Sequence, residues 1–391
     1  MVTILAAIVV IGVIVLVHEL GHFMAARSVG VRVDRFSIGF PPRFLTFTSI
    51  ADGWEFRLFF YGRNSAGKLE WKPIIEKTFR SQGREGSGTE YCFALIPFGG
   101  YVKMAGMVDE SMDSKIEHKP YELMSKPAWA QIWVMSAGVI MNMVLAIVLY
   151  TIVSWTTGAP IVSEDPVVAQ TVEGKPAQEI GLQPGDRILE INGQTVTTWN
   201  EMAELIHAIP NSPIDLTWLH DGEEFEESFT TSFQITIVDG QLDTLGAIGI
   251  YPIVEYEPIG ISKAISTGFR ATIGTLDLIV SSVKMLVSGQ ASMKEIGGPI
   301  FIAQIAGETA RAGWLPLITL IALFSVNLGF LNILPIPGLD GGHILISVIE
   351  VIIRRPLGLK VRMVIQQIGM ALLLLLMITV IINDVGRLFT K

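Results

Sequence analysis

Four apolar stretches, each long enough to cross a lipid bilayer, constrain this chain more than any other feature of its sequence. They cover residues 1–17 (continuing toward 26), 127–155, 312–339 and 363–383. Only 17% of the residues are charged, against about 25% in soluble domains, and the mean hydropathy is +0.51. We therefore expect about four transmembrane helices. The alternative for the first stretch, a signal peptide, lacks a basic start and a cleavage site of small residues.

Basic residues are distributed unevenly between the segments that join these stretches. Residues 26–126 contain 15 of the 28 Lys and Arg, and residues 340–362 contain four more. Residues 157–262 carry 18 acidic residues against two basic ones, a net charge of −16. Because basic segments stay on the cytoplasmic side of a membrane, we expect both termini and this acidic block outside and residues 26–126 inside. Nothing in the pattern indicates a nucleic-acid partner.

Residues 261–288 form a weaker apolar stretch. Lys263, Arg270, Asp277 and Lys284 recur within it at intervals of seven, which places the four charges on one helical face. This pattern favours an amphipathic helix at the membrane surface. A fifth span would bury Asp277 in hydrocarbon, which is costly, and would leave an odd number of crossings.

A short polar pattern closes the first apolar stretch: His18-Glu19-Leu20-Gly21-His22. On a helix, residues four positions apart lie on the same face, so both imidazoles point the same way. This is the spacing of two zinc ligands, with Glu19 placed to act as general base. Such residues at the end of an apolar span are costly unless they are paired or bind a metal. The alternative is a polar cap at the membrane interface.

A zinc site for hydrolysis needs a third protein ligand and one open position. The favoured candidate is Asp340, in the stretch Asn332-Ile-Leu-Pro-Ile-Pro-Gly-Leu-Asp-Gly-Gly-His343. The first and third apolar stretches both run from outside to inside and reach their polar residues at the inner end, so Asp340 is expected at the depth of the two histidines. His343 is the alternative ligand. The single cysteine, Cys92, excludes a multi-cysteine zinc site.

Two prolines, Pro335 and Pro337, interrupt the third apolar stretch. Proline breaks helices, and irregular backbone at membrane depth occurs only inside protein or beside a water-filled cavity. We therefore expect a cavity here that admits water. Asn327 and Asn332 are candidates to bind a substrate backbone, the alternative being hydrogen bonds between packed helices. For Asn142, in the second stretch, close helix packing is the favoured role.

The acidic block contains short strands separated by turns. The run Gly181-Leu-Gln-Pro-Gly-Asp-Arg-Ile-Leu-Glu-Ile-Asn-Gly193 predicts a strand between two turns. A helix is predicted over 199–209, and a hairpin joins 214–219 to 225–229. This block looks like a PDZ domain, a family whose members bind extended peptides by strand addition. The alternative is a spacer that excludes substrates with bulky outer domains.

Residues 90–106 of the inner segment are too apolar for a hairpin that is free in the cytosol. They predict two strands around a Gly-Gly turn, which dip into the membrane beside the site and offer an edge to an unwound substrate. The candidate substrate-binding residues of this hairpin are Pro97, Gly99, Gly100, Tyr101, Val102 and Lys103.

These motifs together resemble the site-2 protease family of intramembrane zinc metalloproteases. Within this family, the chain looks most like the bacterial regulator-of-sigma-E protease branch. The resembling segments are 18–22, 35–40, 95–104, the PDZ-like run, 298–303 and 327–343. The resemblance implies Zn²⁺ as cofactor, a membrane-re-entrant hairpin around residues 97–103, and these roles: His18, His22 and Asp340 as zinc ligands, Glu19 as base, Asn327 and Asn332 as substrate contacts. The sequence departs from the family pattern in two ways. It contains one recognisable PDZ domain where better-known members have two, and residues 46–88 look like an insertion whose role is unknown.

We therefore expect an α-helical membrane protein with about four transmembrane helices, a membrane-associated β-hairpin and an inserted α+β PDZ domain. The expected divisions are transmembrane helix 1 with the His-Glu-x-x-His pattern (1–26), the cytoplasmic segment (27–126), transmembrane helix 2 (127–156), the PDZ domain (157–260), an amphipathic helix and linker (261–311), transmembrane helix 3 with the Leu-Asp-Gly motif (312–343), a cytoplasmic loop (344–362) and transmembrane helix 4 (363–391).

The expected function is hydrolysis of peptide bonds within the transmembrane segments of single-span proteins. The family suggests trimmed anti-sigma factors and remnant signal peptides as substrates, the bacterial cytoplasmic membrane as location and the PDZ domain on its outer side. One alternative is a non-catalytic membrane scaffold with a structural zinc, which would need no base such as Glu19. Another is a zinc transporter, which would need intramembrane ligands at all depths.

Overall fold

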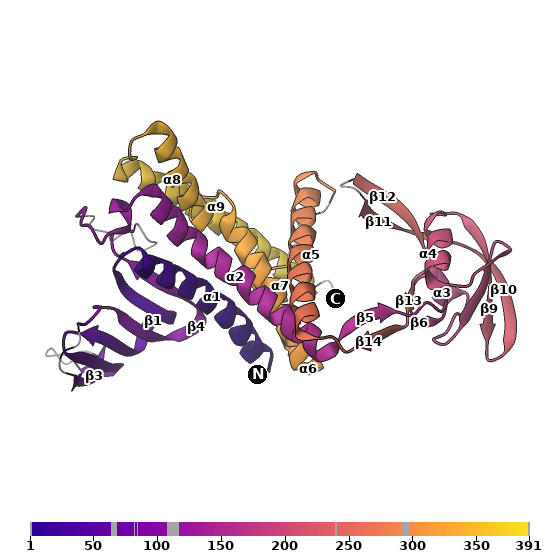
Figure 1. The fold of residues 1–391 in the computed structure, drawn as a ribbon, viewed down its shortest axis with the longest axis horizontal. Coiled ribbons are helices and arrows are strands. Elements are labelled where there is room, and N and C mark those ends of the chain that lie inside the picture. The colour runs from indigo at the N-terminus through magenta and orange to yellow at the C-terminus, as the bar shows by residue number, and fades with distance from the viewer. Residues whose placement is uncertain are drawn as a thin grey trace. The chain divides into compact units, whose positions relative to one another are not determined.

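The computed structural model describes residues 2–63, 69–81, 83, 85–107, 117–238, 241–290, 292 and 297–389. The chain divides into two compact units (Figure 1). Unit 1 combines Met1–Ser154 with Ile261–Lys391, and unit 2 is Trp155–Gly260. The division at the start and end of unit 2 lies close to the boundaries that the sequence indicates for the acidic block.

Four helices, within the described part of the chain, are long and apolar enough to cross a membrane. They are α1 (Val2–Ser28), α2 (Ala128–Thr157), α7 (Trp314–Ile333) and α9 (Leu359–Phe389). Much of their apolar surface has no protein cover: only 11% of the apolar stretch of α9 is buried. Helices that are apolar on all sides and yet exposed match a lipid environment.

The third apolar stretch leaves the helical conformation before its end. α7 stops at Ile333, and residues 334–339, which include both prolines, are not helical. α8 (Asp340–Ile353) begins directly afterwards. Gly341 makes the turn possible, because a Cβ there would lie 2.2 Å from the carbonyl oxygen of Leu334. The break therefore places Asp340 at the start of a new helix.

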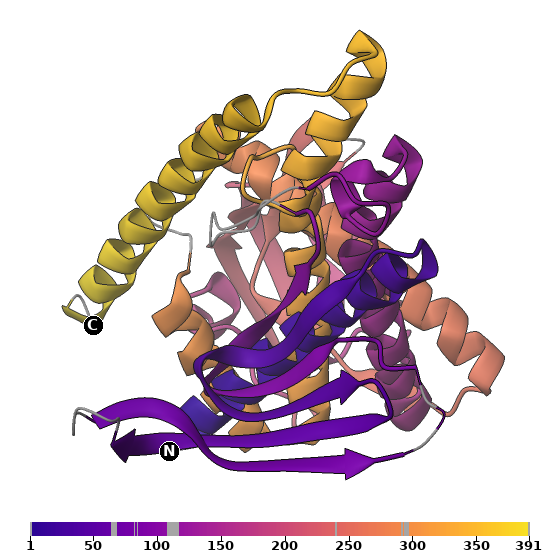
Figure 2. The ribbon, with the colours of Figure 1, turned by 90° about the vertical axis from the view of Figure 1, so that its left-hand side faces the viewer.

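A four-stranded sheet packs beside α1 in unit 1 (Figure 2). Its strands are β1 (Val33–Ile50), β2 (Gly53–Arg63), β3 (Leu69–Arg80) and β4 (Glu90–Met104), in the order β3-β2-β1-β4. Ala25, Phe36 and Val102 belong to one apolar core that joins the helix to the sheet. This core holds β4 against the helix that carries the two histidines.

The prediction of a hairpin within residues 90–106 is wrong, because its two expected strands do not pair with each other. Residues 91–93 and 100–102 of β4 both pair with residues 36–38 of β1. The two halves of β4 therefore flank β1 and do not pair with each other. Gly100 permits the close approach, because a Cβ there would lie 2.4 Å from the carbonyl oxygen of Ser37. Pairing between segments so far apart in sequence leaves no local signal.

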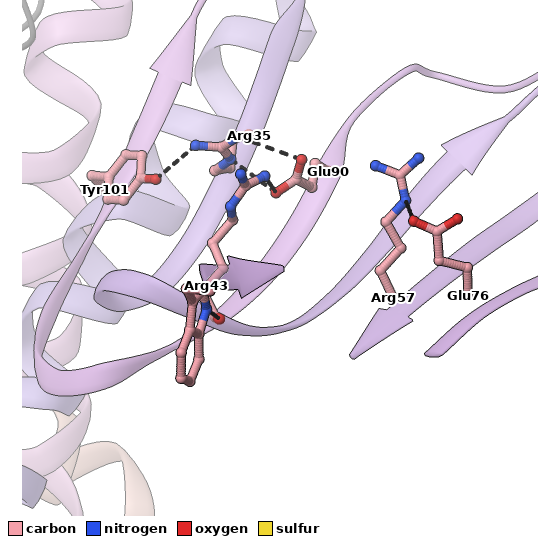
Figure 3. A network of polar contacts seen from close by, with 7 residues as sticks. Arg35, Arg43, Arg57, Glu76, Glu90 and Tyr101 are labelled. Carbon is pink, nitrogen blue, oxygen red and sulfur yellow. Dashed lines mark hydrogen bonds and ion pairs between the residues drawn. The ribbon is translucent and has the colours of Figure 1, made fainter. Parts of the chain in front are cut away.

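Residues 53–80 extend this sheet through β2 and β3. Trp71 of β3 donates from Nε1 to the carbonyl oxygen of Arg43 at 2.7 Å. A polar network follows along β1 and β4 (Figure 3): Glu90 accepts hydrogen bonds from Arg35 at 3.0 Å and Arg43 at 3.3 Å. Arg35 also donates to the hydroxyl of Tyr101 at 3.0 Å. The network ties both halves of β4 to β1.

The helix predicted for residues 261–288 is confirmed as α5 (Ile261–Val287). It is not one of the four helices apolar enough to span, and its place at a membrane surface stays a prediction. The hydroxyl groups of Thr275 on α5 and Tyr150 on α2 lie 3.0 Å apart and share a hydrogen bond.

The next helix, α6 (Pro299–Ala312), packs against α1. Asp384 of α9 caps its first turn. The carboxylate of Asp384 is buried and accepts from the backbone N–H groups of Gly298 and Ile300 at 2.9 Å and Phe301 at 3.2 Å. A carboxylate at a helix N-terminus satisfies free N–H groups and complements the helix dipole, so this contact fixes α9 to α6.

Unit 2 folds around a core of its own that includes Ile188, Leu216 and Trp218. One sheet has the order β10-β9-β7-β8. The helix and hairpin predicted from the sequence are confirmed as α4 and as β9 with β10. The elements are β5 (Ala159–Val162), β6 (Val168–Thr171), α3 (Pro176–Glu179), β7 (Arg187–Ile191), β8 (Gln194–Thr195), α4 (Trp199–His207), β9 (Pro213–His220), β10 (Glu223–Thr230), β11 (Ser232–Val238), β12 (Gln241–Ala247), β13 (Ile250–Pro252) and β14 (Val254–Glu257).

A groove of about 400 Å³ lies in unit 2 between α4 and residues 246–252. Met202 and Ile206 line it from α4, and Ile248 lines it from the opposite side. Lys175 also lines the groove and is one of two basic residues in the strongly acidic block. The groove is therefore lined by more apolar than polar surface, with a positive charge at its wall.

Candidate active site

Two histidines of α1 face a common point. The Nε2 atoms of His18 and His22 lie 3.1 Å apart, and both residues are buried, with 5% of each exposed. Helix geometry alone brings them together, since four residues make slightly more than one turn.

Asp340 reaches the same point from the first turn of α8. Its Oδ2 atom lies 3.1 Å from His18 Nε2 and 3.2 Å from His22 Nε2. Despite these short distances, Oδ2 has no hydrogen bond of acceptable geometry to the residues described. A buried oxygen without a hydrogen bond calls for an explanation. A bound cation would stabilise this arrangement, in which three atoms that can act as metal ligands are in mutual contact.

The three donor atoms fit zinc. Zinc bonds of about 2.0–2.2 Å at tetrahedral angles place neighbouring ligand atoms about 3.3–3.6 Å apart, and here the separations are 3.1–3.2 Å. Two imidazole nitrogens and one carboxylate oxygen leave a fourth position open, as catalytic zinc sites do. Among the described residues, His18, His22 and Asp340 are the only cluster of this kind.

The outer nitrogen of His22 is fixed by the backbone of α2. Nδ1 lies 2.8 Å from the carbonyl oxygen of Val134, an acceptor. Nδ1 must therefore carry the proton and donate it, which leaves the electron pair of Nε2 free for a metal. The backbone thus selects the tautomer that a metal ligand needs.

Glu19 lies close to both the site and the sheet. Its carboxylate interacts electrostatically with His18, His22 and Asp340 and with the backbone of Val102 in β4. The side chain is only partly exposed. A carboxylate in this position can exchange a proton with a water molecule at the open fourth position.

The two candidate asparagines of α7 are placed differently. The side-chain nitrogen of Asn332 lies 3.2 Å from His18 Nε2, so Asn332 borders the cluster. Asn327 makes no hydrogen bond to the cluster within the described part of the chain. The five residues between them turn the helix by about 500°, which leaves the two side chains about 140° apart. The structure therefore brings Asn332, and not Asn327, to the histidines.

The candidate residues of β4 run along α1 beside the site. The carbonyl oxygen of Pro97 would lie 3.9 Å from a Cβ at Gly12, and a Cβ at Gly99 would lie 3.3 Å from Val15. Tyr101 and Val102 follow toward Glu19, and Lys103 pairs with β1. β4 is the last strand of its sheet in the order described, so one of its edges is open in this part of the structure.

Two further polar residues, one on α8 and one on α2, differ in their contact with the cluster. His343, the alternative ligand, lies outside the cluster, and its Nε2 is 2.8 Å from the side-chain nitrogen of Gln366 on α9. Asn142, expected to serve helix packing, lies with its amide nitrogen 3.3 Å from His18 Nδ1. The sequence signal that could have found Asn142 is an amide side chain in the middle of an uncharged apolar stretch.

The site combines two imidazoles and a carboxylate around an open position, with a glutamate on the helix that carries the imidazoles. This combination defines a zinc-dependent peptidase. The comparison with protein families agrees with this class. Residues 6–66 and 77–376 match the family described as peptidase family M50. The insertion expected over residues 46–88 is therefore wrong in its extent, because only residues 67–76 of it lie outside the match. The chain belongs to this family of site-2 proteases, and its expected cofactor is Zn²⁺.

Relatives match over nearly the whole length. The chain is 30% identical to zinc metalloprotease RasP of Bacillus licheniformis and 29% identical to regulator of sigma-W protease RasP of Bacillus subtilis, in each case over 99% of both chains. Two solved PDZ domains of SdrC-like proteins, from Listeria monocytogenes and Listeria innocua, are also similar. They are 24% and 25% identical, cover 24% and 25% of this chain and 93% and 100% of theirs, and give TM-scores of 0.18 and 0.19.

Proposed function

We propose that this chain cleaves peptide bonds inside the membrane-spanning segments of single-span proteins, with His18, His22 and Asp340 holding the zinc ion. The observation that carries the proposal is the position of the cluster along α1. At 1.5 Å per residue, His18 lies about 24 Å from the start of the helix and His22 about 9 Å from its end. A site within a helix that spans the bilayer receives its substrate within the bilayer.

The proposed location is the bacterial cytoplasmic membrane, with unit 2 on the outer side. The basic residues of 26–126 and the acidic residues of unit 2 support this orientation. The cluster then lies toward the cytoplasmic side, near the end of α1 from which β1 continues. The proposed path for water runs beside the non-helical residues 334–339, because such backbone at membrane depth occurs inside protein or beside a water-filled cavity.

The chemistry divides between the ion and the side chains. Zinc in such a site supplies Lewis acidity, which polarises a peptide carbonyl and lets water lose a proton near neutral pH. The Glu19 carboxylate accepts that proton as the C–O bond forms. Glu19 then gives the proton to the amide nitrogen as the C–N bond breaks, and the two halves of the substrate leave. The proposed role of Asn332, whose amide nitrogen lies 3.2 Å from His18 Nε2, is to donate a hydrogen bond to the substrate carbonyl oxygen.

The open edge of β4 is the proposed docking place for the substrate. A peptide bond in a helix is shielded, so the substrate must unwind locally before it is cut. Once extended, it can pair with an edge strand through its backbone. Gly99, Gly100, Tyr101 and Val102 lead directly to Glu19, so a strand added there would pass the proposed base. Pro97 and Lys103 bound the segment.

The groove in unit 2 is the proposed site for a peptide, as in PDZ domains. Its apolar lining suits an aliphatic side chain, and Lys175 suits a carboxylate. A relative is named regulator of sigma-W protease, and we propose a membrane-bound anti-sigma factor, trimmed first by another protease, as the substrate of this chain. Remnant signal peptides are a second proposed substrate class.

The test is cleavage of a single-span substrate that lacks its outer domain, reconstituted with the full chain in liposomes. We expect cleavage by the wild type, loss of cleavage in Glu19→Gln, and normal cleavage in Glu308→Gln, the same change at an exposed position of α6. If no helix-destabilised substrate is cut while zinc remains bound, the chain is a scaffold. Equal cleavage by wild type and Glu19→Gln would exclude Glu19 as the base.

A further inference from the structure

α1 and α2 approach most closely beside the cluster. A Cβ at Gly21 would lie 2.4 Å from the carbonyl oxygen of Ala137, and a Cβ at Gly138 would lie 2.6 Å from both His18 Cε1 and His22 Nε2. The two helices therefore meet backbone to backbone, and the space left between them is filled by imidazoles. Asn142, one turn after Gly138, is fully buried at this contact.

The contacts of Asn142 leave one atom without a partner. Its side-chain amide lies 3.3 Å from His18 Nδ1, and its backbone carbonyl accepts a hydrogen bond from Ser325 Oγ of α7 at 2.8 Å. Its side-chain oxygen, Oδ1, is buried and has no hydrogen bond with any described residue. A buried amide oxygen without a donor is costly.

The proton positions on His18 explain this atom. Nε2 of His18 faces the cluster, 3.1 Å from Asp340, and must be free of a proton to bind a metal. A neutral imidazole then carries its proton on Nδ1, which needs an acceptor. The oxygen and nitrogen of an amide have nearly the same size and exchange places by a half-turn of the group. Such a half-turn brings Oδ1 to Nδ1 and gives both their partner.

We propose that Asn142 is the positioning residue for His18: when zinc is bound, its Oδ1 accepts the hydrogen bond that His18 Nδ1 donates. It thereby selects the tautomer with a free electron pair on Nε2, as the Val134 carbonyl does for His22. The inference rests on the proposed metal site and deepens it. The acceptor for His22 belongs to the backbone and cannot be mutated away, whereas the acceptor for His18 is a side chain and can be tested.

The test is the zinc affinity of the purified full chain, measured by competition with a chromogenic chelator. Asn142→Leu keeps the size and removes the acceptor, and we expect its affinity to fall 10- to 100-fold, the usual loss when the partner of a ligating histidine is removed. Asn142→Asp keeps an acceptor oxygen. Its zinc affinity should be no more than about threefold below that of the wild type. Ser325→Ala removes only the neighbouring contact to the Asn142 backbone and is the matched control, with unchanged affinity.

Two outcomes overturn the proposal. Wild-type affinity in Asn142→Leu would show that His18 needs no acceptor there, and equal loss in Asn142→Leu and Asn142→Asp would show that the amide donates. The NMR spectrum of the zinc-loaded wild type with ¹⁵N-histidine tests the proton position on which the proposal depends: a protonated His18 Nδ1 is expected, and a protonated Nε2 contradicts it. None of these readouts uses cleavage, so an inactive wild type that binds zinc would refute the proposed function and leave this inference standing.

Discussion

Replacing Gly138 by alanine adds one methyl group to the point where α1 and α2 meet. The added Cβ would lie 2.6 Å from His18 Cε1 and from His22 Nε2, whereas ordinary contacts begin at 3.4 Å. One or both imidazoles must therefore move by about 0.8 Å. A shift of about 1 Å in a catalytic group costs on the order of 100-fold in rate. We expect Gly138→Ala to lose about that factor in cleavage and to bind zinc more weakly.

The matched control is Gly274→Ala on α5, where a Cβ would meet nothing within 4 Å. Alanine is favoured over glycine in a helix by about 1 kcal/mol, so this variant should unfold at the same or a higher temperature and keep its activity. Zinc content by mass spectrometry, the melting temperature and the cleavage rate are measured on both variants. Full zinc binding and wild-type cleavage by Gly138→Ala would refute the packing described around the histidines.

Further predictions concern the cap of α6, unit 2 and the metal. Asp384→Ala should lower the free energy of unfolding by about 2–3 kcal/mol, because three backbone N–H groups lose their acceptor. The control, Asp277→Ala at an exposed position, should change it by almost nothing. Equal losses for the two variants in denaturation would contradict the cap. The hydrogen bond to Asp186 raises the pKa of His220 above its ordinary 6.5, so it stabilises unit 2 fully below pH 6.5 and fades as the pH rises through the raised pKa. Hydrogen exchange of unit 2 should show this loss in the wild type and not in Asp186→Asn. Removal of zinc by a chelator should abolish cleavage and lower the melting temperature, and added zinc should restore both.

Local patterns in the sequence account for the elements that build the site. The four-residue spacing of His18 and His22 sets their geometry as soon as α1 is a helix. The two prolines after α7 indicate the break that places Asp340 at the start of α8. Two apolar stretches that run in the same direction reach their polar residues at the same depth, and Asp340 Oδ2 lies within 3.2 Å of both histidines.

Contacts between segments far apart in the sequence could not be predicted from such local patterns. The two halves of β4 flank β1 because Gly100 lets the backbones approach, and a Gly-Gly pair reads locally as a turn. The role proposed for Asn142 depends on the close approach of α1 and α2, which no periodicity shows. The difference between Asn327 and Asn332, in contrast, follows from 3.6 residues per turn and was open to prediction.

The position of the cut bond tests the central claim most directly. Mass spectrometry of both products from a reconstituted single-span substrate locates it to one residue. Because the two histidines lie about 9–15 Å from the end of α1, we predict a bond within the apolar segment of the substrate, toward its cytoplasmic side, and no product from Glu19→Gln. A cut confined to residues outside the apolar segment would contradict intramembrane proteolysis by this chain.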